Sequence, residues 1–277
     1  MELYNKTTFE CSKLITESYS TSFTLGIKTL HKKYHFPIYA VYGFVRFADE
    51  IVDTFHGFDK ETLLERFKSD TYQAIAEKIS LNPVLHAFQL IVNEYKIEYE
   101  LIDAFLKSME MDLYQQEHDT DSYHEYIYGS AEVVGLMCLR VFCEGDEAMY
   151  AQLREPARRL GAAFQKVNFL RDMKSDFQER GRTYFPGVDF SDFSKDSKTL
   201  IEADIDADFE AAFQGIIQLP MGAKKGVHLA YVYYITLFKK IKKLPASRIL
   251  QERIRVPDRK KIALLIGTYF KDSLNFL

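Results

Sequence analysis

Helical periodicity runs through this chain from one end to the other, and it limits the possible folds more than any other feature. Apolar residues recur three and four positions apart, and no pair of alternating apolar and polar runs is joined by a hairpin turn. The sequence therefore predicts an all-α fold. The expected helices cover residues 7–17, 37–56, 60–79, 83–96, 99–117, 122–143, 146–153, 156–179, 197–217, 220–243 and 257–274.

Prolines mark where several of these helices are expected to begin, because a missing N–H costs little there and the fixed φ favours initiation. These residues are Pro37, Pro83, Pro156, Pro220 and Pro257. The one long irregular stretch, residues 180–197, is either a domain linker or a lid. A lid is favoured because the helical segment after it is too short for an independent domain. Residues 1–277 are thus expected to form a single domain.

Charge and cysteine content exclude several classes of function. With 36 basic and 40 acidic side chains, the chain lacks the basic excess of a general nucleic-acid-binding protein. Its three cysteines have no metal-binding or disulfide-framework spacing. The N-terminal residues do not resemble a secretory signal, and the most apolar run, Val133 to Cys143, is shorter than the roughly 20 residues that span a membrane. A cytoplasmic protein that is not integral to a membrane is expected.

The first informative segment is a mostly apolar helix that carries one polar stripe. Tyr42, Arg46, Asp49 and Asp53 follow one another at spacings of 4, 3 and 4, which places them on one helical face. The alternative is an ordinary amphipathic helix, on which Arg46 pairs with Glu50 and the aspartates face water.

A second segment repeats this pattern and weakens that alternative. Gln165, Asn168, Asp172 and Asp176 follow one another at spacings of 3, 4 and 4, again among apolar residues. Buried carboxylates that lack a partner are costly, so these should be metal-bound, ion-paired or protonated.

Oxygen ligands without histidine or thiolate favour Mg²⁺, or Mn²⁺, over zinc. Because Mg²⁺ usually completes its shell with water and substrate phosphate oxygens, the inferred ligand is a diphosphate. Arg46, Arg171 and Arg182 could contact its oxygens in a bidentate manner.

A third segment, residues 126–142, combines small residues with bulky apolar neighbours. Gly129, Ser130, Ala131 and Gly135 permit either close helix packing, the favoured interpretation, or space for a ligand chain. Glu132 lies in this apolar context and is expected to have a partner, for which Arg140 and a tyrosine are the candidates.

Taken together, these segments resemble the squalene/phytoene synthase family, and within it the bacterial phytoene synthases. The resemblance covers most of the chain. It rests on five ordered motifs, YSTSF (19–23), VYGFVRFADEIVD (41–53), MEMDL (109–113), YIYGSAEVVG (126–135) and QKVNFLRDMKSD followed by GRTYFP (165–186).

The resemblance implies an isoprenoid (terpenoid) synthase fold with a central cavity, in which two aspartate-rich helices face each other around Mg²⁺ ions. The implied metal ligands are Asp49, Asp53, Asn168, Asp172 and Asp176. The four aspartates also count as catalytic, together with Tyr126, which matches the family tyrosine near the reacting allylic carbons. The implied substrate-binding residues are Tyr19, Ser20, Thr21, Ser22, Tyr42, Arg46, Gln165, Arg171, Arg182 and Tyr184.

The implied function is the Mg²⁺-dependent head-to-head (1′-1) condensation of two geranylgeranyl diphosphates through a cyclopropyl (prephytoene) diphosphate, with release of two diphosphates, in carotenoid biosynthesis. NADPH is not expected, because the sequence shows no nicotinamide site. One alternative is a dehydrosqualene or squalene synthase that uses farnesyl diphosphate. An alternative of another class is a non-catalytic prenyl-lipid-binding or assembly protein. Peripheral contact with the inner membrane face during product release and the oligomeric state are left open.

Two departures from the family pattern bear on the site. Ser130-Ala131-Glu132 stands where many members read V-A-G, which places a carboxylate at a position usually held by glycine. Tyr19 stands where several relatives carry histidine. Neither change affects an implied metal ligand.

Overall fold

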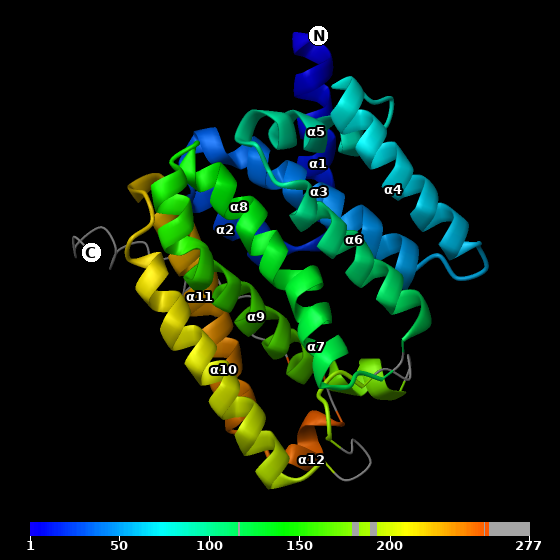
Figure 1. The fold of residues 1–277 in the computed structure, drawn as a ribbon. Coiled ribbons are helices and arrows are strands. Elements are labelled where there is room, and N and C mark those ends of the chain that lie inside the picture. The colour runs from blue at the N-terminus through cyan, green and yellow to red at the C-terminus, as the bar shows by residue number, and fades with distance from the viewer. Residues whose placement is uncertain (116, 179–182, 189–192, 252, 255–277) are drawn as a thin grey trace.

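The computed structural model describes residues 1–277 apart from 116, 179–182, 189–192, 252 and 255–277. The described part is a bundle of helices without a strand, and its one bridge joins Glu117 to Thr183, so the predicted all-α fold is confirmed (Figure 1). In chain order the helices are α1 Glu2–Tyr19, α2 Thr21–Thr29, α3 Lys32–Asp53, α4 Lys60–Glu77, α5 Pro83–Tyr95, α6 Tyr99–Tyr114, α7 Thr120–Ile127, the π-helix η1 Tyr128–Glu132, α8 Val133–Cys143, α9 Glu147–Gln178, α10 Lys195–Ile216, α11 Met221–Lys242 and α12 Ala246–Ile249.

One apolar cluster surrounds α3, which contacts α1, α2, α4, α5, α6 and α8. At its centre the fully buried Phe44 ring stacks on Phe88, with 3.8 Å between ring centroids. Phe67 and Phe105 pack against Phe44 from α4 and α6, with centroids 5.5 and 5.3 Å away. Burial of these rings is the main source of stability in this part of the molecule.

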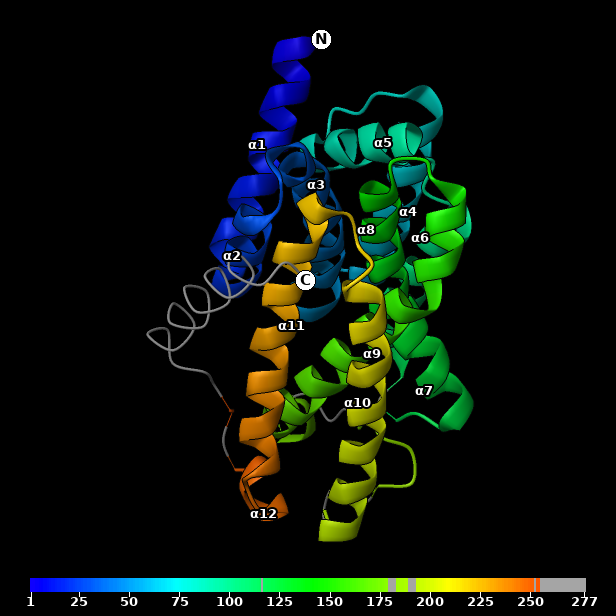
Figure 2. The same ribbon diagram turned by 90° about the vertical axis from the view of Figure 1, so that its left-hand side faces the viewer.

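A second apolar cluster lies among α9, α10 and α11, the three long helices that run side by side (Figure 2). Val167 and Leu170 of α9 and Phe238 of α11 are fully buried, and Phe209 of α10 is almost fully buried. The two clusters leave a cavity between them.

The prolines only partly mark helix starts. Pro83 is the first residue of α5, and Pro220 directly precedes α11, as predicted. Pro37 instead lies inside α3, and Pro156 lies inside α9, which is one helix of 32 residues where two were predicted. An added Cβ at Gly215 of α10 would lie 2.3 Å from the Pro156 ring, so the two helices are in close contact there. Pro257 and the predicted helix 257–274 lie outside the described residues.

The segment Thr120–Cys143, formed by α7, η1 and α8, is by length and composition able to cross a membrane. It is 24 residues long, and 56% of its most apolar window is buried inside the fold. The whole segment is therefore long enough to span a membrane, whereas the run Val133 to Cys143 alone is not. In this fold it packs as a core helix against α6 and α9. The π-helical turn in its middle adds one residue to the helical turn, a feature that is frequent at functional sites.

Candidate active site

A cavity of about 680 Å³ lies between the two apolar clusters, which is within the range of small-molecule sites. Residues of α2, α3 and α6 to α11 line it, together with Tyr19 at the end of α1. Along α3 the lining changes from Ile38 to Tyr42 and then to Asp49 and Asp53. Along α9 it changes in the same direction, from Leu153 and Leu160 to the polar stripe of residues 165–176. The cavity thus has apolar walls towards the beginning of both helices and polar walls towards their ends.

The stripe on α3 faces this cavity, as predicted. Arg46 forms an ion pair with Glu50, and its Nη1 lies 3.8 Å from Asp49 Oδ2. Its guanidinium also lies over the Tyr19 ring, 4.3 Å from the centroid. The Arg46–Glu50 pair of the amphipathic alternative is therefore present, yet Asp49 and Asp53 line the cavity and are only partly exposed.

The N-terminal motif closes one side of the cavity. Ser20 is the N-cap of α2 and accepts a hydrogen bond from the Phe23 N–H at 3.2 Å. Phe23 in turn stacks on Tyr42, with 4.9 Å between ring centroids. Burial raises the pKa of Tyr42, so its hydroxyl is a neutral hydrogen-bond donor near pH 7. Ser22 also lines the cavity.

The stripe on α9 lies in the same cavity and is linked to its neighbours. Gln165 Nε2 donates to Ser130 Oγ of η1 at 3.4 Å, and Tyr234 of α11 donates to Asn168 Oδ1 at 3.3 Å. Asp172 accepts a hydrogen bond from Arg171 Nε at 3.0 Å and pairs with Arg253 Nε at 2.7 Å.

Two charged residues stand at this polar end, one buried and one partly buried. Asp176 lines the cavity and is 7% exposed. Burial opposes the charge of Arg171, but the Asp172 carboxylate outweighs this effect and raises the pKa of the guanidinium. Arg171 is therefore a permanent cation in the wall, suited to a phosphate group.

Tyr126 and Tyr184 line the wall near the end of α6. Tyr126 is 4% exposed, and its hydroxyl donates to both carboxylate oxygens of Asp112, at 3.0 and 3.1 Å. Tyr184 follows the bridge at Thr183 and stacks on Phe169 of α9, with 3.9 Å between ring centroids. Its ring centroid is 5.4 Å from that of Tyr126.

One predicted substrate-binding residue, Thr21, does not join this group, since it is exposed and does not line the cavity. Another, Arg182, lies outside the described residues, as do residues 180, 181 and 189–192 of the predicted lid.

Several lining residues were not predicted. Asp112 belongs to a motif that the sequence analysis noted but gave no role. Tyr233 and Tyr234 come from an aromatic run of α11, and Arg253 comes from the segment after α12. No spacing connects them with the aspartate stripes, so only the motif around Asp112 and the run of tyrosines gave any signal.

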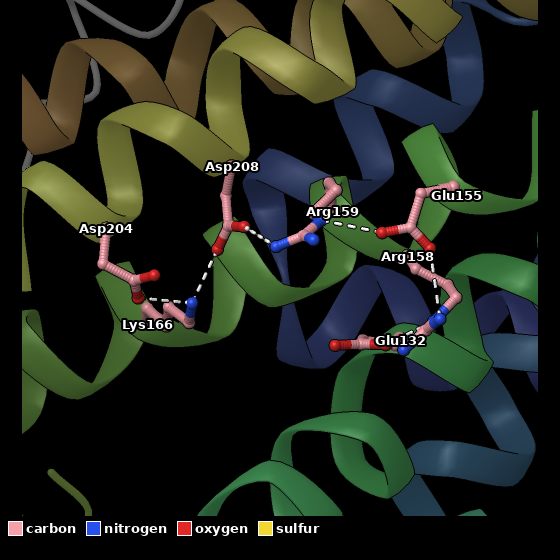
Figure 3. A network of polar contacts seen from close by, with 7 residues as sticks. All are labelled: Glu132, Glu155, Arg158, Arg159, Lys166, Asp204 and Asp208. Atoms are coloured by element: carbon pink, nitrogen blue, oxygen red, sulfur yellow. Dashed lines mark hydrogen bonds and ion pairs between the residues drawn. The ribbon is translucent and has the colours of Figure 1, made fainter.

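Glu132 points away from the cavity, although its neighbours Ser130 and Ala131 line it. Its partner is Arg158 of α9, whose Nε is 2.6 Å from Glu132 Oε2 (Figure 3). Arg140, one predicted candidate, instead bonds to Glu98 and Glu147. Burial raises the pKa of Glu132, and Arg158 opposes that rise. The unusual carboxylate in the third motif thus contributes to packing rather than to the cavity wall.

This pair is one end of a network of charges behind α9. It continues through Glu155 and Arg159 to Asp208 of α10, and then to Lys166 and Asp204 (Figure 3). Asp208 is 1% exposed and Lys166 is 6% exposed, with 2.7 Å between Oδ2 and Nζ. Lys166 directly follows Gln165 in sequence, about 100° around the helix, so the network holds the flank of α9 beside the polar stripe.

The donors in the cavity suit a hard divalent cation. Carboxylates and two amides come from α3, α6 and α9, and the described lining contains no histidine. Its one cysteine, Cys138, is a neutral thiol because burial raises its pKa to about 12. In the part of the chain that the structure describes, no three acidic, histidine or cysteine side chains are close enough to hold a metal by themselves. This arrangement fits Mg²⁺, which is commonly bound by one or two carboxylates and completed by substrate phosphates rather than by a protein cage.

Comparisons with known proteins agree with this geometry. The family model described as squalene/phytoene synthase matches residues 16–260. The chain is 25% identical to a 4,4′-diapophytoene synthase of Staphylococcus haemolyticus over 194 residues, covering 69% of this chain and 66% of the relative. It is 28% identical to a phytoene synthase of Arthrospira platensis over 211 residues, covering 72% and 67%. It is 27% identical to a 15-cis-phytoene synthase of Synechocystis over 290 residues, covering 93% and 83%.

Solved structures show the same fold. A dehydrosqualene synthase in complex with a ligand superposes with a TM-score of 0.82 at 22% identity, covering 98% of both chains. The squalene synthase HpnC from Alicyclobacillus acidocaldarius superposes with a TM-score of 0.77 at 19% identity, covering 87% of this chain and 95% of that one. The helices therefore have the terpenoid synthase fold, as predicted.

Proposed function

This chain belongs to the squalene/phytoene synthase family, whose members are prenyltransferases, and on that premise we propose that it is an enzyme of the phytoene synthase type. The proposed reaction joins two geranylgeranyl diphosphates head to head. It releases two diphosphates and does not use NADPH.

One observation carries this proposal. The two aspartate stripes line one cavity together with arginines and a long apolar wall, although Asp53 and Asp172 are 119 positions apart in the sequence. A diphosphate needs the polar end, and a prenyl chain needs the apolar end.

The residues at the polar end have distinct tasks. Asp49, Asp53, Asn168, Asp172 and Asp176 would hold Mg²⁺. When bound, Mg²⁺ supplies positive charge that stabilises the departing diphosphate. Arg46 and Arg171 would bind its oxygens, with Tyr42 as a neutral donor.

The apolar walls hold the prenyl chains and keep water from the allylic cation that forms when the first diphosphate leaves. The 2,3-double bond of the second substrate attacks this cation, and loss of a proton gives the cyclopropyl diphosphate. Departure of the second diphosphate permits rearrangement to the 1′-1 linked skeleton, and a final proton loss gives the polyene. Tyr126, which is buried in the wall, would accept one of these protons.

The similarity to a diapophytoene synthase favours one second candidate, in which the substrate is the shorter farnesyl diphosphate. Chain length is set by the side chains that close the apolar end. Leu30, Phe142, Leu153 and Leu219 lie at this end of the lining.

Product analysis tests both candidates. The purified protein is incubated with Mg²⁺ and either geranylgeranyl or farnesyl diphosphate, with and without NADPH, and the extracted hydrocarbon is identified by mass. Phytoene from the longer substrate, independent of NADPH, is expected. A product from farnesyl diphosphate alone would move the assignment to the second candidate, and no hydrocarbon from either substrate would refute the proposed function.

A further inference from the structure

Asp112 of α6 holds the hydroxyl of Tyr126 in one orientation. The Tyr126 Oη lies 3.0 Å from Asp112 Oδ2 and 3.1 Å from Oδ1, and both residues line the cavity. The Tyr126 ring is fixed as well, because the rings of His118, Tyr184 and Phe169 have centroids 5.0, 5.4 and 6.1 Å away. The pair is thus a preformed part of the cavity wall.

The direction of this hydrogen bond decides what Tyr126 can offer a ligand. A phenol has one proton and an ionised carboxylate has none, so the proton of Tyr126 points to Asp112. The phenol oxygen can then present only lone pairs to the cavity. A group that presents lone pairs accepts protons and stabilises positive charge, which is the requirement beside an allylic cation.

We propose that Asp112 is a positioning residue that completes a proton relay with Tyr126, an inference that rests on the proposed function. As a C–H bond of the condensed cation breaks, its electron pair forms the new carbon–carbon bond and its proton binds Tyr126 Oη. The original Tyr126 proton passes at the same time to Asp112, so the phenol stays neutral and the carboxylate becomes a carboxylic acid. Asp112 then returns this proton to water or to the released diphosphate before the next turnover.

Asp112→Asn tests the relay, because the amide keeps the shape of the side chain but cannot take up the proton. The expected result is a fall in kcat of about 100-fold or more with KM changed less than about threefold, as for loss of a general base. Asp112→Glu should recover at least about a tenth of wild-type kcat. Tyr126→Phe should lose as much as Asp112→Asn, and the double variant should lose no more than either, because both residues act in one step.

Glu110→Gln is the matched control, since it removes a carboxylate from the same helix that pairs with Lys68 at 2.7 Å, on the surface. It should leave kcat unchanged. Three results would overturn the relay: a wild-type kcat in Asp112→Asn, a change in KM alone, or a loss of kcat that more Mg²⁺ reverses.

Thermal melting shows whether Asp112→Asn is folded. If it is not, the inference depends on Asp112→Glu and Tyr126→Phe, and equal kcat of Tyr126→Phe and wild type overturns it. Because each variant is compared with an active wild type, failure of the relay is distinct from failure of the proposed function.

Discussion

The two helices that carry the aspartate stripes are held in place by different forces. Behind its stripe, α3 is packed by apolar side chains, and Phe44 at the centre is fully buried against Phe88. Behind its stripe, α9 has apolar neighbours as well, but also the buried pair of Lys166 and Asp208. Apolar burial has no preferred direction, whereas an ion pair has a fixed geometry.

This difference indicates which contacts set the rotation of each stripe. Neighbours on six other helices surround α3, so its packing leaves little freedom to turn. The long helix α9 packs against η1 and α8 as well as against α10, and on the α10 side the Lys166–Asp208 pair and the contact of Pro156 with Gly215 fix its register. We therefore expect loss of a buried charge on α10 to disturb the stripe on α9, while a change in the apolar packing of α3 mainly lowers stability.

The largest expected effect is on turnover. Asp49→Asn and Asp172→Asn should each reduce turnover on the order of a thousandfold, because each removes a charge that would hold Mg²⁺. Asp172→Asn should also lower the free energy of unfolding, by about 2 kcal/mol, because Asp172 pairs with both Arg171 and Arg253. Turnover at saturating Mg²⁺ and urea denaturation measure the two effects. Near wild-type turnover in both variants would contradict the assignment.

The next effect is on the α9–α10 contact. Asp208→Asn should lower the free energy of unfolding by about 3 kcal/mol, because it leaves the buried Lys166 without its closest buried partner. It should also reduce turnover. Asp206→Asn on the same helix is the control, since Asp206 pairs with Lys242 on the surface and should contribute less than about 1 kcal/mol. Equal stability of the two variants would show that the buried pair does not anchor α9.

A smaller effect is expected in the core around α3. Phe44→Leu should lower the free energy of unfolding by about 1.5 kcal/mol, since part of the ring contact with Phe88 is lost. The turnover of the folded protein should stay within about twofold of wild type. A turnover loss as large as that of Asp208→Asn would remove the distinction between the two helices.

The smallest effect is a pH dependence of stability at the far end of the charge network. Burial raises the pKa of Glu132, so its contribution to stability is present below the ordinary carboxyl pKa and is lost as pH rises through the raised value. Glu98 is the opposite case. Burial opposes its charge, but hydrogen bonds from Arg140 prevail and lower its pKa, so its contribution is present above the ordinary value and is lost as pH falls.

This contrast is measured by melting wild type, Glu132→Gln and Glu98→Gln between about pH 3 and pH 7. The differences in melting temperature should correspond to less than about 1 kcal/mol in the free energy of unfolding. The advantage of wild type over Glu132→Gln should shrink as pH rises, and its advantage over Glu98→Gln should grow. Parallel trends for both variants would contradict the contrast.

Much of the fold could be predicted because helical spacing is a local property of the sequence. The helix Thr21–Thr29 was missed because it is short and separated from α1 only by Ser20. The break expected at Pro156 does not occur, because packing of its ring on Gly215 outweighs the intrinsic cost of proline in a helix.

The candidate site also combines residues that local helical spacing predicts with residues that only tertiary packing brings together. The two stripes were predictable because a helix places residues three and four apart on one face. Asp112, Tyr234 and Arg253 were not, since they reach the cavity from other elements whose approach depends on tertiary packing. The partner of Glu132 was missed for the same reason, because Arg158 lies on α9 and Arg140 is occupied by Glu98.

The central claim is that the two stripes act together to bind a Mg²⁺-diphosphate group. Isothermal titration of the wild type with a non-ionising prenyl thiodiphosphate, with and without Mg²⁺, tests it most directly. The account predicts binding that requires Mg²⁺ and is lost in Asp49→Asn and in Asp172→Asn alike, because neither helix suffices alone. Equal affinity without Mg²⁺, or wild-type binding in both variants, would contradict it.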